Sequence, residues 1–189
     1  MPIRLAQGRT STGGPKLIQG WAIWVTGLPA SGKSTISNLV KGKLAEEGVS
    51  AQILETDELR RILTPNPTYS LEEREIFYTS LSYIGWLLTI NGVNVIYDAT
   101  ANRRRWRDYA RARIPRFIEI YMNCPLEICE ARDPKGIYKQ AATGQARFVP
   151  GAQQDYEPPF APEVTLDCRE DPKRLADQLM EEIRRRGLV

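Results

Sequence analysis

Short apolar runs alternate along the chain with longer amphipathic stretches, and this pattern predicts strands and helices in turn. The runs with the length of buried strands are residues 21–26, 51–54, 93–97, 117–122 and 164–166. The stretches with helical start and stop signals are residues 33–47, 57–63, 70–91, 103–113, a segment that starts at Pro125, and 172–186. Since a helix or crossover follows each strand, we predict an α/β fold of three layers, with a five-stranded parallel sheet covered by helices on both faces.

The order of these elements predicts one domain over residues 21–189. Ser70 and Glu73 have the spacing of a capping box, which predicts the start of the longest helix. Residues 1–20 contain no apolar segment and are expected to form a flexible arm. Residues 135–154 are polar, contain glycines and lack a clear core face, so we expect a mobile lid there.

Composition indicates a soluble protein of ordinary character. Its net charge of +3 suits an anionic small molecule as well as it suits nucleic acid. No run approaches the roughly 20 apolar residues of a membrane span, and no secretory signal is evident, so a cytoplasmic location without a membrane partner is expected. The three cysteines, Cys124, Cys129 and Cys168, are odd in number and lack a CxxC pair, which argues against zinc and disulfides and predicts buried thiols.

The segment from Gly27 to Thr35 has the spacing G-x-x-x-x-G-K-S of a P-loop, placed between a predicted strand and a predicted helix. Its glycines let backbone N–H groups approach phosphate oxygens, and the helix N-terminus adds positive potential. Lys33 is positioned to reach the β- and γ-phosphates as a catalytic cation, and the Ser34 hydroxyl to bind Mg²⁺. The residues predicted to bind ATP here are Gly27, Leu28, Pro29, Ala30, Ser31, Gly32, Lys33, Ser34 and Thr35.

Two carboxylates follow predicted strands, at the sheet edge where ligands gather. Asp57 could orient an attacking hydroxyl or accept its proton, and the chain has no histidine to serve instead. Asp98 ends an apolar run in the manner of a Walker-B strand, which predicts a Mg²⁺ ligand acting through water. Either residue could instead simply cap the next helix.

The sequence also contains features of two other classes of protein, a nucleic-acid-binding protein and a regulatory nucleotide switch. Seven arginines between residues 103 and 116 could form a nucleic-acid surface, but their spacing spreads them around a helix, so a solvated helix with one or two arginines directed at phosphates is expected. A regulatory nucleotide switch is a distant alternative. The D-x-x-G match that begins at Asp133 falls far from a switch position, and no N-K-x-D motif is present.

The second half of the chain resembles a known family. Residues 129–138, Cys-Glu-Ala-Arg-Asp-Pro-Lys-Gly-Ile-Tyr, are similar to the C-E-x-R-D-P-K-G-L-Y segment of adenylylsulfate (APS) kinases, and residues 155–158 fall at that family's Y-E-x-P element. The resemblance covers residues 20–189. It implies a P-loop kinase fold, phosphorylation of the 3′-hydroxyl of adenosine 5′-phosphosulfate with ATP and Mg²⁺, and a homodimer.

The resemblance also implies roles for particular residues. Arg132 would contribute to the ATP site. Asp57 would be catalytic, and the groups implied in substrate binding are Asp57, Arg60, Tyr69, Arg74, Lys135 and Phe148.

The departures from the family cluster on the acceptor side. Phe77 stands where the family has asparagine, Ala101 where it has serine, Val149 where it has the second stacking aromatic, and Gln153 where it has aspartate. The segment from Asp98 to Arg103 also resembles other small P-loop kinases. Another nucleotide-linked small molecule and a polynucleotide 5′-hydroxyl therefore stay open as alternative acceptors.

Overall fold

Five parallel strands form a single sheet in the order β2-β3-β1-β4-β5 in the computed structural model, which describes residues 19–189. The strands are β1 (Ala22–Gly27), β2 (Ala51–Glu55), β3 (Asn94–Asp98), β4 (Phe117–Asn123) and β5 (Val164–Asp167). The helices are α1 (Lys33–Glu46), α2 (Thr56–Leu63), α3 (Leu71–Ile90), α4 (Arg104–Arg111), α5 (Leu126–Arg132), α6 (Ile137–Ala142) and α7 (Pro172–Arg185). The predicted elements are present with bounds shifted by no more than two residues, and α6 is an addition to them.

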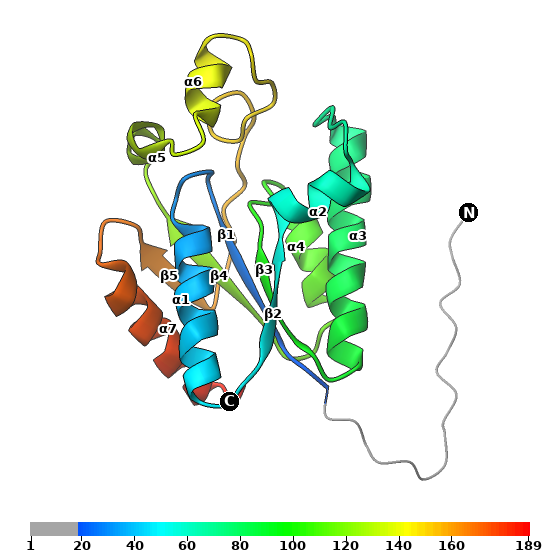
Figure 1. Ribbon diagram of the computed structural model, residues 1–189, viewed down its shortest axis with the longest axis vertical. Coiled ribbons are helices and arrows are strands. Elements are labelled where there is room, and N and C mark those ends of the chain that lie inside the picture. The colour runs from blue at the N-terminus through cyan, green and yellow to red at the C-terminus, as the bar shows by residue number, and fades with distance from the viewer. Residues whose placement is uncertain (1–18) are drawn as a thin grey trace, which may run out of the picture.

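Helices cover both faces of the sheet, as predicted. Helices α1 and α7 pack on one face, and α3 and α4 on the other (Figure 1). Strand β1 supplies both cores, because Ile23 and Val25 point to the α1 side while Trp24 points to the α3 side. A strand buried on both faces must be apolar throughout, which explains its uninterrupted run.

Helix α3 lies unusually close to β3. A Cβ at Gly85 would come within 1.9 Å of the Tyr97 hydroxyl, so glycine is required at this contact. The helix starts where the capping box predicted, with the Ser70 hydroxyl accepting from the Glu73 backbone N–H at 3.2 Å. The Glu73 carboxylate is directed to Arg60 and Thr68 instead of back to the cap.

The arginines of α4 and its flanks bind other groups of the protein, and the expectation of a solvated helix is wrong for the buried Arg107, whereas Arg105 is exposed. Arg107 is fully buried, pairs with Glu119 at 2.6 Å, and donates to two backbone carbonyls. Arg111 forms two hydrogen bonds with Glu163, which in turn accepts from the Glu119 backbone. None of the seven arginines lines the cleft described below, so none is directed at a phosphate there. The side chains are used instead to join α4 to β4 and to the segment before β5.

The fold does not test two of the predictions, the flexible N-terminal arm and the cytoplasmic location. The arm predicted for residues 1–20 lies, up to residue 18, outside the described residues. Among the helices between residues 19 and 189, none has the length and apolar character needed to cross a membrane. The cytoplasmic location stays a prediction.

Candidate active site

The carboxyl ends of the strands open into a cleft of about 650 Å³. Because parallel strands end at one edge, groups far apart in sequence meet here. The sequence-predicted residues that line the cleft are Pro29, Ala30, Ser31, Gly32, Lys33, Ser34, Thr35, Asp57, Arg60, Tyr69, Arg74, Asp98, Arg132 and Lys135. Gly27, Leu28 and Phe148 do not line it.

The P-loop has the backbone geometry of a phosphate cradle. Gly27, Ala30 and Gly32 all have positive φ, at 150°, 61° and 100°. For Ala30 this conformation costs about 1–3 kcal/mol, and such strain concentrates at functional sites. Helix α1 begins at Lys33, and no side chain caps its first N–H groups. These N–H groups are therefore available to an anion.

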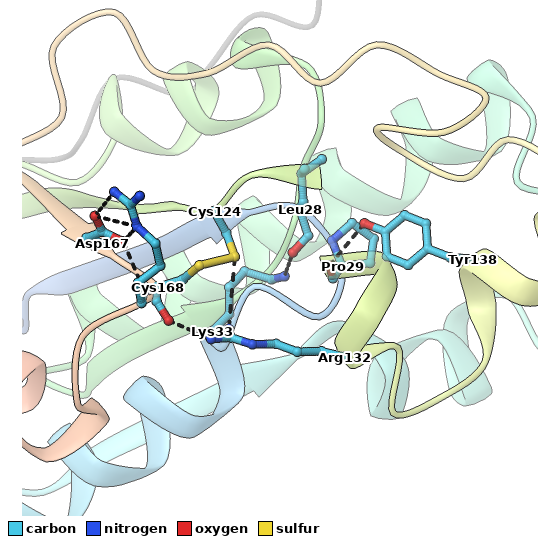
Figure 2. The surroundings of a disulfide bond; sticks show 9 residues. Leu28, Pro29, Lys33, Cys124, Arg132, Tyr138, Asp167 and Cys168 are labelled. Carbon is cyan, nitrogen blue, oxygen red and sulfur yellow. Dashed lines mark hydrogen bonds and ion pairs between the residues drawn. A yellow bond between two sulfur atoms is a disulfide. The ribbon is translucent and has the colours of Figure 1, made fainter. Parts of the chain in front are cut away.

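The Lys33 ammonium turns back over the loop. Its Nζ donates to the Leu28 carbonyl at 2.8 Å (Figure 2). Burial lowers the pKa of Lys33, and the nearby charge of Asp98 opposes that shift. The lysine has no ion-pair partner among the described residues, so it is a buried cation that a bound phosphate would stabilise.

Asp98 and Ser34 provide the hard oxygen groups that Mg²⁺ prefers. Asp98 is buried at the end of β3 and lines the cleft, and its carboxylate accepts no hydrogen bond from residues 19–189. It does not cap the next helix, because the residue before α4 is Arg103. The described residues contain no cluster of three metal-ligating side chains. A hydroxyl and one carboxylate fit an ion that retains several waters and binds substrate phosphates.

Asp57 lies in the first turn of α2, one residue past its start, so the N-cap interpretation is wrong. Its carboxylate forms an ion pair with Lys135, which reaches across from the segment between α5 and α6. Both side chains are more than half exposed, and the hydrogen bond to Asp57 raises the pKa of Lys135. Two residues with implied substrate roles therefore meet across the cleft from opposite sides.

A buried pair of arginines forms the wall between α2 and α3. The Arg60 guanidinium lies 3.9 Å from the centre of the Phe77 ring and pairs with Glu73 at 3.1 Å. Arg74 donates to the carbonyls of Tyr69 and Phe148 and to Asn102. Burial lowers the pKa of Arg74, and its described acceptors carry no charge.

All four of the departures from the APS kinase pattern lie outside the cavity, and Ala101 is fully buried. Phe77 is only 1% exposed, because it packs beneath Arg60, and Val149 is 2% exposed. Gln153 is exposed but donates to Ala141 and Ala146 within residues 135–154. The apolar residues at positions 77 and 149 thus do not replace polar surface in the cleft.

The segment 135–154 has a core face, contrary to prediction. It contains α6, and its Tyr138 and Val149 are buried in the core on the α1 side. The Tyr138 hydroxyl donates to the Pro29 carbonyl at 3.0 Å, so this segment contacts the P-loop directly. Asp133 accepts from the backbone N–H groups of residues 137–139 and thereby fixes the start of α6. Lid mobility remains a prediction.

The residues that follow β5 also line the cleft, and the sequence patterns did not predict them as site residues. Cys168, Arg169, Glu170, Pro172 and Leu175 all line it. Their position directly after a strand, at the carboxyl edge of the sheet, could have indicated a role in the site, but the residues form no recognisable motif.

A disulfide joins Cys124 to Cys168, and the expectation of free buried thiols holds only for Cys129. The bond connects the ends of the neighbouring strands β4 and β5. Arg132 donates to the Cys168 carbonyl at 2.6 Å and lies 3.9 Å from the Cys124 sulfur (Figure 2). The disulfide therefore supports the position of Arg132 at the cleft.

Comparisons with known proteins identify the family. The sequence model of the adenylylsulphate kinase family matches residues 19–167. The adenylyl-sulfate kinase of Microcystis aeruginosa is 38% identical over 161 residues, which are 85% of this chain and 88% of the relative. The chain belongs to the adenylylsulphate kinase family. A probable adenylyl-sulfate kinase of Pyrococcus abyssi is 41% identical over 79% of this chain and 86% of the relative.

Solved structures agree with this assignment. The Mycobacterium tuberculosis APS kinase in complex with AMPPNP and APS has a TM-score of 0.83 at 32% identity, covering 88% of this chain and 98% of that chain. Shikimate kinase from Aquifex aeolicus, at 12% identity and a TM-score of 0.57, shares the fold alone. The P-loop kinase fold predicted from the sequence is thus confirmed, and the protein is a phosphotransferase of this family.

The disulfide leads to a prediction about stability. Because the closed loop spans 44 residues, replacing both Cys124 and Cys168 with serine should lower the free energy of unfolding by about 4 kcal/mol. Denaturant unfolding measures this. The wild-type protein should lose stability on addition of a reductant, whereas the double variant should not respond to it.

A count of reactive thiols provides the check. In denaturant without reductant, a maleimide should label one cysteine per chain, and after reduction it should label three. Three labels without reductant would show that the disulfide does not form.

Proposed function

We propose that this chain transfers the γ-phosphoryl group of ATP to the 3′-hydroxyl of adenosine 5′-phosphosulfate, as the resemblance implies. The observation that carries the proposal is the pairing of charges in the cleft. Lys33, Arg74 and Arg132 have only uncharged hydrogen-bond partners among residues 19–189. Lys33 and Arg74 are buried, and Arg132 is exposed at the cleft. Buried cations without carboxylate partners favour ligands that carry several negative charges. ATP and a phosphosulfate have that character.

The donor half of the cleft is formed by the P-loop and by Arg132. Backbone N–H groups at the start of α1 would hold the phosphates, and Lys33 would stabilise charge that develops on the transferred group. When bound, Mg²⁺ would supply further charge neutralisation on the phosphates, held by Ser34 and through water by Asp98.

The acceptor half is formed by the walls of α2 and α3. Asp57 would orient the attacking hydroxyl and accept its proton, because it follows β2 at the sheet edge and no histidine is present. Arg60 and Arg74 would hold the acidic tail, and Tyr69 and Phe148 would contact the base. Lys135 would leave Asp57 for an anionic substrate group as residues 135–154 close over the cleft, which would exclude water.

The relatives and the Mycobacterium tuberculosis structure support this acceptor. The names of the relatives refer to adenylyl-sulfate, and the Mycobacterium tuberculosis structure is described as a complex with APS. The burial of Phe77 and Val149 removes the main argument for a different acceptor. A role in sulfate activation would follow from the product, a 3′-phosphorylated phosphosulfate.

The two cleft carboxylates have separable roles in this proposal. Asp57→Asn keeps the side-chain shape, so kcat should fall by a hundredfold or more while the KM for ATP stays within about twofold. Asp98→Asn should instead raise the Mg²⁺ concentration needed for half-maximal rate. Steady-state kinetics with varied ATP and varied Mg²⁺ distinguish the two, and the opposite pattern would exchange the roles.

The acceptor is tested with purified protein and ATP. We expect consumption of ATP that depends on APS at micromolar concentration and yields a product phosphorylated on the 3′-hydroxyl. Lys33→Ala is the matched control and should lose at least a hundredfold in kcat, since transition-state stabilisation is removed. Other nucleotide-linked acceptors and 5′-hydroxyl oligonucleotides serve as competitors. Turnover with one of these and none with APS would refute the proposed substrate but not the kinase activity.

Homodimer formation is a separate proposal that the resemblance implies. Helix α3 exposes the apolar side chains of Ile76, Tyr83 and Leu87 at intervals of seven and four residues, which places them along one stripe. Light scattering should give twice the mass of the chain for the wild type, and Tyr83→Glu should shift it toward the monomer. A monomeric wild type would refute the dimer.

A further inference from the structure

The disulfide between Cys124 and Cys168 lies beside the donor half of the cleft. It joins the residue after β4 to the residue after β5, and the P-loop residues Leu28 and Lys33 belong to its surroundings (Figure 2). Cys168 lines the cleft, whereas Cys124 does not. The disulfide is therefore part of the wall beside which a nucleotide held by the P-loop would lie.

The two cysteines differ in how a reductant would approach them. Cys124 and Cys168 are nearly buried, at 6% and 5% exposure, and Cys168 is the one that borders the cleft. Within residues 19–189, the cleft is therefore the approach to the bond that the geometry offers. A reductant that enters the cleft meets Cys168 first, and a nucleotide bound there would block it.

Arg132 makes Cys124 the better leaving group of the two. Its guanidinium lies 3.9 Å from the Cys124 sulfur and donates to the Cys168 carbonyl at 2.6 Å. A cation beside a cysteine favours its thiolate, and a disulfide exchanges faster when the leaving sulfur is stabilised as a thiolate. While the disulfide is intact, both partners of Arg132 are neutral, so its charge remains for a ligand.

We propose that the Cys124–Cys168 disulfide is a thiol-exchange site, at which a dithiol reductant lowers the affinity of this kinase for ATP through Arg132. A thiolate of the dithiol attacks the Cys168 sulfur, the Cys124–Cys168 bond breaks, and Cys124 leaves as a thiolate beside Arg132. The second thiol of the dithiol then attacks the dithiol sulfur of the mixed disulfide, and Cys168 leaves. The dithiol is oxidised to its own disulfide and gives two electrons to the cysteines. Its two protons go to Cys168 and, because Cys124 remains a thiolate, to solvent.

Reduction changes the donor half in two ways, and both act through Arg132. The covalent link between the ends of β4 and β5 is lost, so the Cys168 carbonyl no longer holds the guanidinium in a fixed place. The Cys124 thiolate also attracts the charge that the oxidised protein leaves for a ligand. Since both changes weaken the binding of ATP, linkage requires that bound ATP favour the oxidised form. The inference rests on the proposed function for the assignment of this end of the cleft to ATP.

The affinity for AMPPNP, an ATP analogue that resists hydrolysis, tests this effect without turnover. Calorimetry on protein reduced with dithiothreitol should give a Kd about tenfold higher than on oxidised protein, a usual size for coupling between two sites. Circular dichroism verifies that the reduced protein is folded. Cys129→Ala is the matched control, because it removes the free thiol, keeps the disulfide, and should show the same change. An equal Kd in folded oxidised and reduced protein would overturn the proposal.

Arg132→Met tests whether the guanidinium carries the effect. The variant should bind AMPPNP more weakly than the wild type, and reduction should then change its Kd by less than about twofold, because the two changes share one cause. A full tenfold change in Arg132→Met would refute the role of Arg132. The double variant with serine at positions 124 and 168 should not respond to dithiothreitol, and a response would show that the reductant acts elsewhere.

The rate of reduction gives a readout that does not require the reduced protein to stay folded. Saturating AMPPNP should slow the reduction of the disulfide by about tenfold or more, measured by maleimide labelling of quenched samples in denaturant. Sucrose, at a concentration that stabilises the fold as much as AMPPNP does, is the control and should leave the rate nearly unchanged. Equal slowing by both would show that reduction requires global unfolding and would refute the exchange site. Failure of APS as a substrate would refute the proposed acceptor and leave these results standing.

Discussion

The parallel direction of all five strands is the constraint on which the site depends. Each strand delivers its carboxyl end to one edge, so the P-loop after β1, Asp57 after β2, Asp98 in β3 and Cys168 after β5 lie around one cleft. Burial on both faces favours apolar side chains along the strands, and the polar groups that line the cleft lie where strands end. The chemistry of the protein is therefore concentrated at one side of the sheet.

Charge pairing distinguishes three cations of the cleft from the arginines in and around α4. The arginines in and around α4 are bound to carboxylates or to carbonyls outside the cleft, and the buried pair of Arg107 and Glu119 joins α4 to β4. In the cleft, Lys33, Arg74 and Arg132 have neutral partners, so positive charge remains for a ligand. Composition alone, with a net charge of +3, does not reveal this division.

The loops around the acceptor half are held by tertiary hydrogen bonds. Glu73 joins Arg60 to the loop before α3, and Arg74 joins that loop to residue 148 and to Asn102. Tyr138 fastens α6 to the P-loop through the Pro29 carbonyl. If these loops move when a ligand binds, the few hydrogen bonds that hold them must either break or move with them. These hydrogen bonds therefore connect the donor half of the cleft to the acceptor half.

The sequence by itself determined the elements, their order and the P-loop, because these depend on local patterns: apolar runs, a capping box at Ser70, and glycines at fixed spacing. It also placed Asp57 and Asp98 at strand ends. Only the tertiary structure decided the Cys124–Cys168 disulfide, the burial of Phe77 and Val149, and the partners of each arginine. These features depend on distances between residues that are remote in the chain, as Arg74 and Phe148 are, and no local pattern encodes such a distance.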